Sequence, residues 1–222
     1  MQKDISAQIV HTSLKATTLL TDIEQLCKEA IENKFSAVCV PPLFVLKAKE
    51  FTAGTTIKVA TVVGFPLGYS AIEAKLAEIL LAIVDGADEI EMVINIAALK
   101  NNDWQYLANE INSINPIVKR KGKGLNVIIE TGLLTNEEII KCCDIYGMAG
   151  IDFIETSTGF AERGVTLDTV KLMRKHVAAG VRVSASGEIK SYSFALELLN
   201  AGADRISSSW SLEIIKQAAA LN

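Results

Sequence analysis

The sequence lacks any apolar run close to the ~18 residues that a membrane-spanning helix requires. Its first residues, Met1–Asp4, also lack the apolar core of a secretion signal, so we expect neither a leader segment nor a membrane partner. Positive charge is not in excess, since the formal net charge is −4 and the one basic cluster lies at residues 119–123. A nucleic acid is therefore not expected as a partner.

Cysteine and histidine are scarce, with four cysteines and two histidines in 222 residues. No two cysteines have the CxxC spacing of a metal site, and the adjacent pair Cys142 and Cys143 is poorly placed to chelate one ion. The sequence predicts buried, reduced thiols in a cytoplasmic protein, with no metal and no cofactor.

What the chain does contain is one short pattern in three copies: Gly86-Ala-Asp, Gly150-Ile-Asp and Gly202-Ala-Asp. Each copy follows an amphipathic stretch and precedes a short β-rich run, so each is expected to join a helix to a strand. A glycine suits this place because the residue after a helix commonly adopts a left-handed conformation. The repetition indicates a βα architecture.

Eight apolar, strand-like runs alternate with amphipathic, helix-like stretches along the chain. Continuous apolar strands are typical of parallel sheets that are buried on both faces. The sequence therefore predicts an α/β protein, a (β/α)8 TIM barrel formed by one domain over residues 1–222. Capping boxes beginning at Thr21, Ser70 and Thr135 are expected to start three of the helices. The expected strands are residues 7–11, 36–40, 57–63, 89–94, 125–130, the run ending at 155, 181–185 and 204–207.

Functional groups of a TIM barrel lie at the carboxyl ends of its strands and in the loops that follow. In this chain those positions hold carboxylates, hydroxyls and a histidine, with no obvious lysine. Crowded or desolvated carboxylates resist ionisation, so one of them can act as an acid while another acts as a base. The residues expected there are His11, Cys39, Gly64, Phe65, Glu91, Asn95, Glu130, Thr131, Glu155, Thr156, Ser184, Ser186, Ser207, Ser208 and Ser209.

Several longer stretches resemble those of the deoxyribose-phosphate aldolase family, across essentially the whole chain. They include residues 58–68 (KVATVVGFPLG), 87–95 (ADEIEMVIN), 127–134 (VIIETGLL) and 155–160 (ETSTGF). The resemblance implies a TIM barrel and a lysine Schiff base that cleaves deoxyribose 5-phosphate into acetaldehyde and glyceraldehyde 3-phosphate. We accordingly expect a small-molecule carbonyl substrate as partner, and we allow for a homodimer.

This chain departs from the family at the residues to which the resemblance assigns that chemistry. Glu155 stands where the family has the Schiff-base lysine, and Ser184 where it has a second lysine that lowers the pKa of the first. Glu91 replaces an aspartate of the proton relay, and Asn126 replaces another strand lysine. A carboxylate cannot form an imine, because it offers no neutral nitrogen to attack the carbonyl carbon.

The phosphate-binding segments implied by the resemblance differ as well. Gly187-Glu188 stands in place of a Gly-Gly turn, and Trp210 follows the serines at 207–209. A carboxylate and a bulky indole both oppose a phosphate group, so a ligand without phosphate is expected. Trp210 is expected to stack on an aromatic or sugar face.

We therefore expect Glu155, Glu91 and Ser184 to be the catalytic residues of a carboxylate acid–base site. Arg182 provides the alternative, a partner that merely neutralises Glu155, because it faces the same side of its strand as Ser184. The expected substrate-binding residues are His11, Cys39, Asn95, Glu130, Thr156, Ser157, Gly187, Glu188, Ser209 and Trp210. A purely structural role is the alternative for the first two and for Glu130.

Three functions are compatible with this pattern. The first is an enzyme on an aldolase scaffold that condenses, cyclises or isomerises a small carbonyl compound by proton transfer. The second is an inactive aldolase homologue that binds a metabolite or a partner. The third is a deoxyribose-phosphate aldolase whose catalytic machinery has been displaced.

Overall fold

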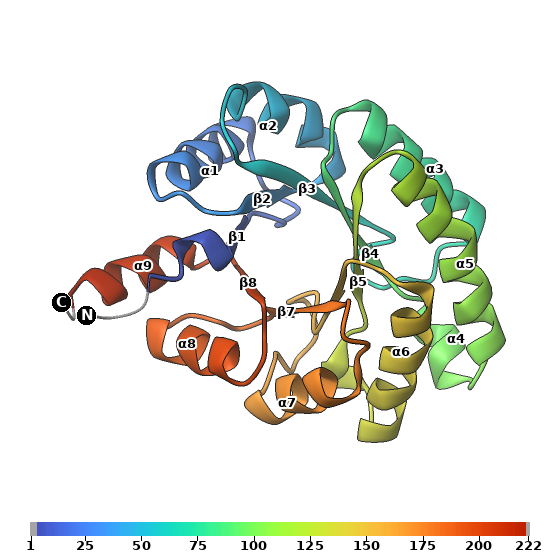
Figure 1. Ribbon diagram of the computed structural model, residues 1–222. Helices are drawn as coiled ribbons and strands as arrows, with labels where there is room; N and C mark the ends of the chain where they lie inside the picture. The colour runs from blue at the N-terminus through green and yellow to red at the C-terminus, as the bar shows by residue number, and fades with distance from the viewer. Residues whose placement is uncertain (1–3, 221–222) are drawn as a thin grey trace.

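A computed structural model describes residues 4–220, which form a closed barrel of eight parallel strands in sequence order (Figure 1). Each strand pairs with the next, and β8 closes the barrel on β1. This arrangement confirms the predicted TIM barrel. The strands are β1 (Ile9–Thr12), β2 (Ala37–Val40), β3 (Lys58–Val63), β4 (Glu89–Val93), β5 (Gly124–Ile128), β6 (Phe153–Glu155), β7 (Arg182–Ser186) and β8 (Arg205–Ser208).

Helices surround the barrel (Figure 1). They are α1 (Leu20–Glu32), α2 (Val45–Phe51), α3 (Ile72–Val84), α4 (Ile96–Lys100), α5 (Trp104–Arg120), α6 (Asn136–Ala149), α7 (Leu167–His176), α8 (Tyr192–Asn200) and α9 (Ser211–Ala220), with 3-10 turns η1 (Ser6–Gln8), η2 (Pro42–Phe44) and η3 (Thr131–Leu133). Within residues 4–220, no helix has the length and apolar character needed to cross a membrane. Residues 1–3, in which no leader was expected, and residues 221–222 lie outside the described part.

The three Gly-x-Asp segments join helices to strands, as predicted. Their glycines, at 86, 150 and 202, have φ angles of +104°, +63° and +115°. The aspartate of each joint accepts a hydrogen bond from a backbone N–H of the preceding strand. Asp88 accepts from Val59 at 3.0 Å, Asp152 from Leu125 at 2.9 Å, and Asp204 from Val183 at 2.7 Å. Each joint therefore ties the start of its own strand to the strand before it.

The barrel interior is apolar on one side and polar on the other. Strands β1, β2 and β3 contribute a small apolar cluster of Val10, Ala37, Cys39, Ala60 and Val62. Strands β4 to β8 contribute the buried polar residues Glu89, Glu91, Asn126, Glu155, Ser184, Arg205 and Ser207. The larger apolar core lies between the barrel and its helices. The polar side of the interior is consequently where charged groups meet.

Of the three predicted helix caps, one is confirmed and two are wrong. Thr135 and Glu138 form the predicted capping box at the start of α6, with bonds of 3.3 and 2.8 Å. At α1 the carboxylate of Asp22 instead accepts from the N–H of Leu19, at 2.8 Å. Helix α3 begins after Ala71, and no side chain caps it. A sequence pattern names candidate caps, but the path of the preceding loop decides which N–H groups need one.

Candidate active site

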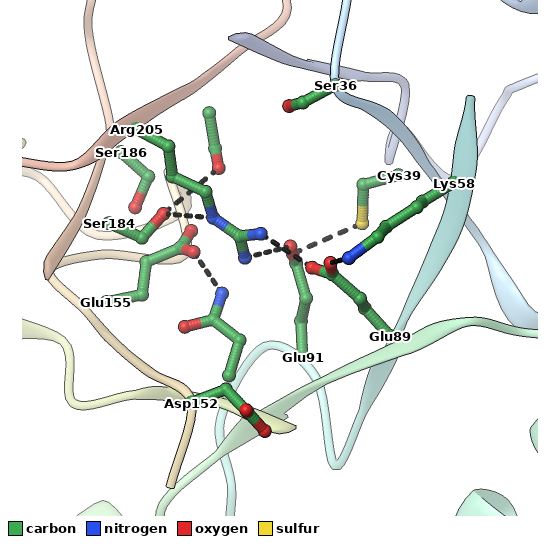
Figure 2. A network of polar contacts seen from close by, with 12 residues as sticks. Ser36, Cys39, Lys58, Glu89, Glu91, Asp152, Glu155, Ser184, Ser186 and Arg205 are labelled. Atoms are coloured by element: carbon green, nitrogen blue, oxygen red, sulfur yellow. Dashed lines mark hydrogen bonds and ion pairs between the residues drawn. The ribbon is translucent and has the colours of Figure 1, made fainter. Parts of the chain in front are cut away.

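Arg205 lies at the centre of a buried polar network inside the barrel (Figure 2). Its Nη1 donates to Oε2 of Glu89 at 2.6 Å, and its Nε donates to Oγ of Ser184 at 3.1 Å. Its Nη2 lies 3.5 Å from Oε1 of Glu91. Burial disfavours the charge of Arg205, but the carboxylates of Glu89, Glu91 and Glu155 outweigh burial and raise its pKa. Arg205 is therefore a fixed positive charge below the two candidate catalytic glutamates.

Glu91 is the carboxyl group of this site whose pKa is most clearly raised into the neutral range. It is 2% exposed, and the thiol of Cys39 donates to its Oε2 at 3.2 Å. Burial and then the negative charge of Glu155 raise the pKa of Glu91 to about 8, against the opposing charge of Arg205. Burial, followed by the charge of Glu91, also raises the pKa of Cys39 well above its usual value. At neutral pH Glu91 is therefore mostly protonated, and Cys39 is a neutral thiol rather than a nucleophile.

Glu155 is the carboxylate beside that acid. It ends β6, is 2% exposed, and accepts a hydrogen bond from Nδ2 of Asn126 on the neighbouring strand. Ser184 is opposite Glu155 in the register of β6 and β7, but its hydroxyl bonds to Arg205 and lies 3.4 Å from that of Ser207. The two glutamates are close enough for the charge of Glu155 to act on Glu91.

A cavity of about 120 Å³ lies at the carboxyl end of the strands. Among its described lining residues there is no lysine, arginine or histidine. The hydroxyl of Ser157 is buried here and has no hydrogen-bond partner within residues 4–220. The lining residues are Thr12, Leu14, Phe65, Glu91, Ile128, Glu155, Ser157, Thr158, Gly159, Ser186, Gly187, Glu188, Ile189, Ser207, Ser208, Ser209 and Trp210.

The structure brings seven of the expected catalytic and substrate-binding residues to this cavity. They are Glu91, Glu155, Ser157, Gly187, Glu188, Ser209 and Trp210. Cys39 and Ser184 do not line it. Cys39 donates to Glu91, and the hydroxyl of Ser184 lies 3.4 Å from that of Ser207, and both of these partners line the cavity. Carboxylates, hydroxyls and aromatic faces are thus the chemical groups available to a ligand.

Four other residues expected to bind substrate lie outside the central cavity. Val10 faces the barrel interior, so His11 faces α1, where its Nε2 lies 2.9 Å from Oε2 of Glu29. Asn95 lies beyond the end of β4, not on the same strand face as Glu91, and its side chain caps α4 by accepting from Ala98 at 3.0 Å.

The other two, Glu130 and Thr156, support the loops around the cavity. Glu130 accepts from the backbone N–H of Thr158 at 3.1 Å and lines a neighbouring cavity of about 330 Å³. Burial raises the pKa of Glu130, although the backbone N–H and the hydroxyl of Thr158 both donate to it and act in the opposite direction. Thr156 donates to the backbone oxygen of Ser186 at 2.9 Å.

Arg205 was not predicted from the sequence, which offered Arg182 as the alternative partner of Glu155. The guanidinium of Arg182 instead stacks on the ring of Phe153, 3.8 Å from its centre, one register step below Glu155. Arg205 lies 3.7 Å from the same ring. A usable signal was present, because Glu89, Phe153 and Arg205 each follow the aspartate of a Gly-x-Asp joint. Equivalent joints place these residues in one layer of the barrel interior.

Metal binding finds no support in this geometry. Among residues 4–220, no three His, Cys, Asp or Glu side chains are grouped so that they could hold a metal ion.

Comparison with known proteins agrees with the barrel and with the motifs. The profile of the DeoC/LacD family aldolases matches residues 4–203. A deoxyribose-phosphate aldolase of Thermococcus kodakarensis is 44% identical over 219 residues, which cover 98% of each chain. A deoxyribose-phosphate aldolase of Clostridioides difficile is 44% identical over 214 residues, which cover 96% of each chain.

Solved structures give the same result. A putative deoxyribose-phosphate aldolase from Coccidioides immitis has a TM-score of 0.93 at 33% identity, with 97% of this chain and 86% of that chain covered. The aldolase QR15 has a TM-score of 0.91 at 35% identity over the whole of both chains. The chain therefore belongs to the DeoC/LacD family of aldolases.

Proposed function

We propose that this chain transfers protons on a small carbonyl compound through an enol, as in condensation, cyclisation or isomerisation, without a lysine Schiff base. The observation that most supports this is the pairing of a protonated carboxyl group, Glu91, with the carboxylate of Glu155 on the wall of one cavity. Proton transfer needs an acid and a base in fixed positions, and a carboxyl group with a raised pKa beside a second carboxyl group can supply both.

In this proposal Glu155 removes a proton from the carbon next to the carbonyl group, while Glu91 gives its proton to the carbonyl oxygen. The product of this step is a neutral enol, and Glu91 is left as a carboxylate facing Arg205, 3.5 Å away. Arg205 stabilises that new negative charge, and the bond from Asn126 holds Glu155 in place. Return of a proton from Glu155 to carbon and of the enol proton to Glu91 restores the pair. Return to the same carbon exchanges its hydrogen, and return to the neighbouring carbon of an enediol isomerises the compound.

The lysines near the barrel support a mechanism that needs no imine. The resemblance in sequence places the Schiff-base lysine at the position of Glu155. Lys58 is paired with Glu89 at 2.8 Å, and Lys190 is paired with Glu188. Neither of them belongs to the described residues that line the cavity.

Deuterium exchange tests this proposal. We expect the protein to accelerate the exchange of α-hydrogens of hydroxyacetone or acetaldehyde in D2O, followed by proton NMR. Glu155→Gln and Glu91→Gln should each lower that rate by roughly 100-fold or more, because each removes one proton-transfer group. Glu162→Gln, which changes an exposed carboxylate outside the central cavity, is the control and should keep the rate. Absence of exchange with both compounds would contradict the proposal.

The curated relatives favour a second candidate, a deoxyribose-phosphate aldolase with displaced machinery. Relatives of that name are 44% and 46% identical to this chain. This candidate predicts release of acetaldehyde from 2-deoxyribose 5-phosphate and a covalent adduct that borohydride traps with acetaldehyde. Glu155→Lys, assayed in parallel, shows whether a lysine at this position is enough for trapping. The candidate fails if the unchanged protein gives neither product nor adduct.

The third function, a binding protein without turnover, predicts stabilisation by a carbonyl ligand with neither exchange nor trapping. The proposal also includes a homodimer, which Leu81 and Val84 on α3 support because they are 67% and 81% exposed. Light scattering tests it. A cytoplasmic location remains part of the proposal, and it is supported by four cysteines that are free and buried.

A further inference from the structure

The charged side chains that line the central cavity, in the described part of the chain, are all carboxylic acids: Glu91, Glu155 and Glu188. Two nearby cations already have partners. Arg205 pairs with a buried glutamate below the cavity at 2.6 Å, and Lys190 pairs with Glu188 at the rim. The cavity therefore presents carboxyl groups and no cationic side chain to a ligand, which disfavours an anion and favours a cation.

A second, independent observation is the hydroxyl of Ser157. This side chain is 1% exposed and lines the cavity, and its Oγ has no hydrogen-bond partner among residues 4–220. A buried polar group left without a partner destabilises the fold, because its lost hydrogen bonds to water are not replaced. A ligand group that donates a hydrogen bond to Ser157 removes that cost.

A third observation is the backbone at Glu188. Its φ angle is +61°, in the left-handed region that favours glycine. Residues other than glycine are destabilised there, because Cβ crowds the following carbonyl oxygen. The fold nevertheless keeps a carboxylate at this position on the cavity wall, and strained residues of this kind concentrate at functional sites.

Trp210 supplies an aromatic face beside Glu188. The ammonium of Lys190 lies 5.7 Å from the centre of the Trp210 ring, so a cation already occupies the space next to this indole. An ammonium group is attracted to the face of a tryptophan ring. Ser157, Glu188 and Trp210 thus offer a hydrogen-bond acceptor, a counter-charge and a π-face within one cavity.

We propose that the substrate bears a primary amine, bound as an ammonium group by Ser157, Glu188 and Trp210, in place of a phosphate. The ligand ammonium takes over the carboxylate of Glu188 from Lys190, which is half-exposed and free to move into solvent. Glu91 and Glu155 remain available for the carbonyl end of the molecule. This inference rests on the proposed function, since it names the substrate class of the same site.

Three probes that differ only at their central carbon test the inference. Serinol has an ammonium group there, glycerol has a hydroxyl group, and glycerol 2-phosphate has a phosphate group. Binding is measured at constant ionic strength by NMR, from the indole N–H signal of Trp210, with Trp104 as the internal control. We expect serinol to bind at least ~10-fold more tightly than glycerol, a difference of about 1.4 kcal/mol. Glycerol 2-phosphate should bind more weakly than glycerol.

Variants of the amine site separate recognition from folding. Glu188→Gln should reduce the preference for serinol over glycerol at least ~5-fold, and Ser157→Ala should weaken the binding of serinol at least ~5-fold. Glu188→Gly should remove the preference and also raise the melting temperature, because it relieves the left-handed strain. Glu162→Gln, an exposed carboxylate that does not line this cavity, is the matched control and should keep the preference.

Equal binding of the three probes, tighter binding of glycerol 2-phosphate, or an unchanged preference in Glu188→Gln would overturn the inference. Its failure is distinguishable from that of the proposed function. Exchange that depends on Glu155, without any serinol preference, contradicts only the amine site. Serinol preference without exchange contradicts only the proton-transfer mechanism.

Discussion

Arg205 and Glu89 occupy the same position in two copies of the Gly-x-Asp joint, and their side chains meet inside the barrel with Nη1 2.6 Å from Oε2. Both side chains are 7% exposed, although 116 residues separate them along the chain. Burial alone would raise the pKa of Glu89, but Arg205 and Lys58 together outweigh burial and lower it. The pair connects the base of the barrel to Glu91.

Removal of Arg205 is expected to destabilise the barrel strongly. Arg205→Met leaves the buried Glu89 with only the half-exposed Lys58 as partner, and an uncompensated buried charge costs about 3–5 kcal/mol. Urea unfolding at pH 7 measures the loss, and Arg205→Met combined with Glu89→Gln should recover part of it. Lys47→Met, which breaks an exposed pair, is the control and should cost less than about 1 kcal/mol. Equal losses of stability in Arg205→Met and Lys47→Met would refute the role of the buried pair.

Stability should fall as the pH rises through the raised pKa of Glu91. The folded protein holds this proton up to about pH 8, whereas the unfolded chain loses it near the ordinary glutamate pKa of 4.5. The stabilising contribution is therefore complete below the unfolded pKa and is lost as the pH rises through the folded pKa. Between pH 6 and pH 9 the unfolding free energy should fall by roughly 2 kcal/mol more in the unchanged protein than in Glu91→Gln. Parallel pH profiles of the two proteins would contradict the assignment.

Loss of the neighbouring charge should move that pKa in a known direction. Glu155→Gln removes the negative charge that helps to raise the pKa of Glu91, so the pKa should fall below about 8. Carbon NMR of labelled glutamate measures the titration directly. Arg205 lowers the same pKa, so the conservative change Arg205→Lys should leave it within about one unit. A pKa that stays the same in Glu155→Gln would show that the two carboxyl groups do not interact.

The aspartates of the joints should contribute to stability individually. Asp152→Ala leaves the N–H of Leu125 without its 2.9 Å partner, and an unsatisfied backbone group costs about 1–3 kcal/mol. Thermal and urea unfolding measure this loss. Asp144→Ala on α6 changes an exposed aspartate nearby and should have an effect of less than about 0.5 kcal/mol. Equal losses in the two variants would argue against a structural role for the joint.

The buried pair outside the barrel provides a fifth test. Lys75 and Glu110 lie 2.7 Å apart with both side chains 0% exposed, between α3 and α5. Lys75→Met should destabilise by about 3–5 kcal/mol, because it leaves Glu110 charged or protonated without its partner. Lys75→Met with Glu110→Leu should recover most of the loss, since both polar groups are then removed. Failure of the double variant to recover stability would mean that packing, rather than charge, dominates at this position.

Local patterns predicted the barrel because they depend on neighbouring residues in the chain. The Gly-x-Asp joints, the alternation of strands and helices and the Thr135 cap are all decided within a few residues. The orientation of His11 was not predictable in the same way. Both faces of a parallel barrel strand are buried, so apolar residues on either side of His11 give no period that distinguishes inside from outside.

The amino-acid sequence by itself determined the order of the strands, the helix-to-strand joints and the presence of Glu91 and Glu155 at strand ends. Only the tertiary structure decided which charges meet: Arg205 with Glu89, Lys75 with Glu110, and Glu155 with Asn126. Closure of the barrel brings together residues that no local pattern relates. In that low-dielectric interior each carboxyl group takes its pKa from neighbours distant in sequence.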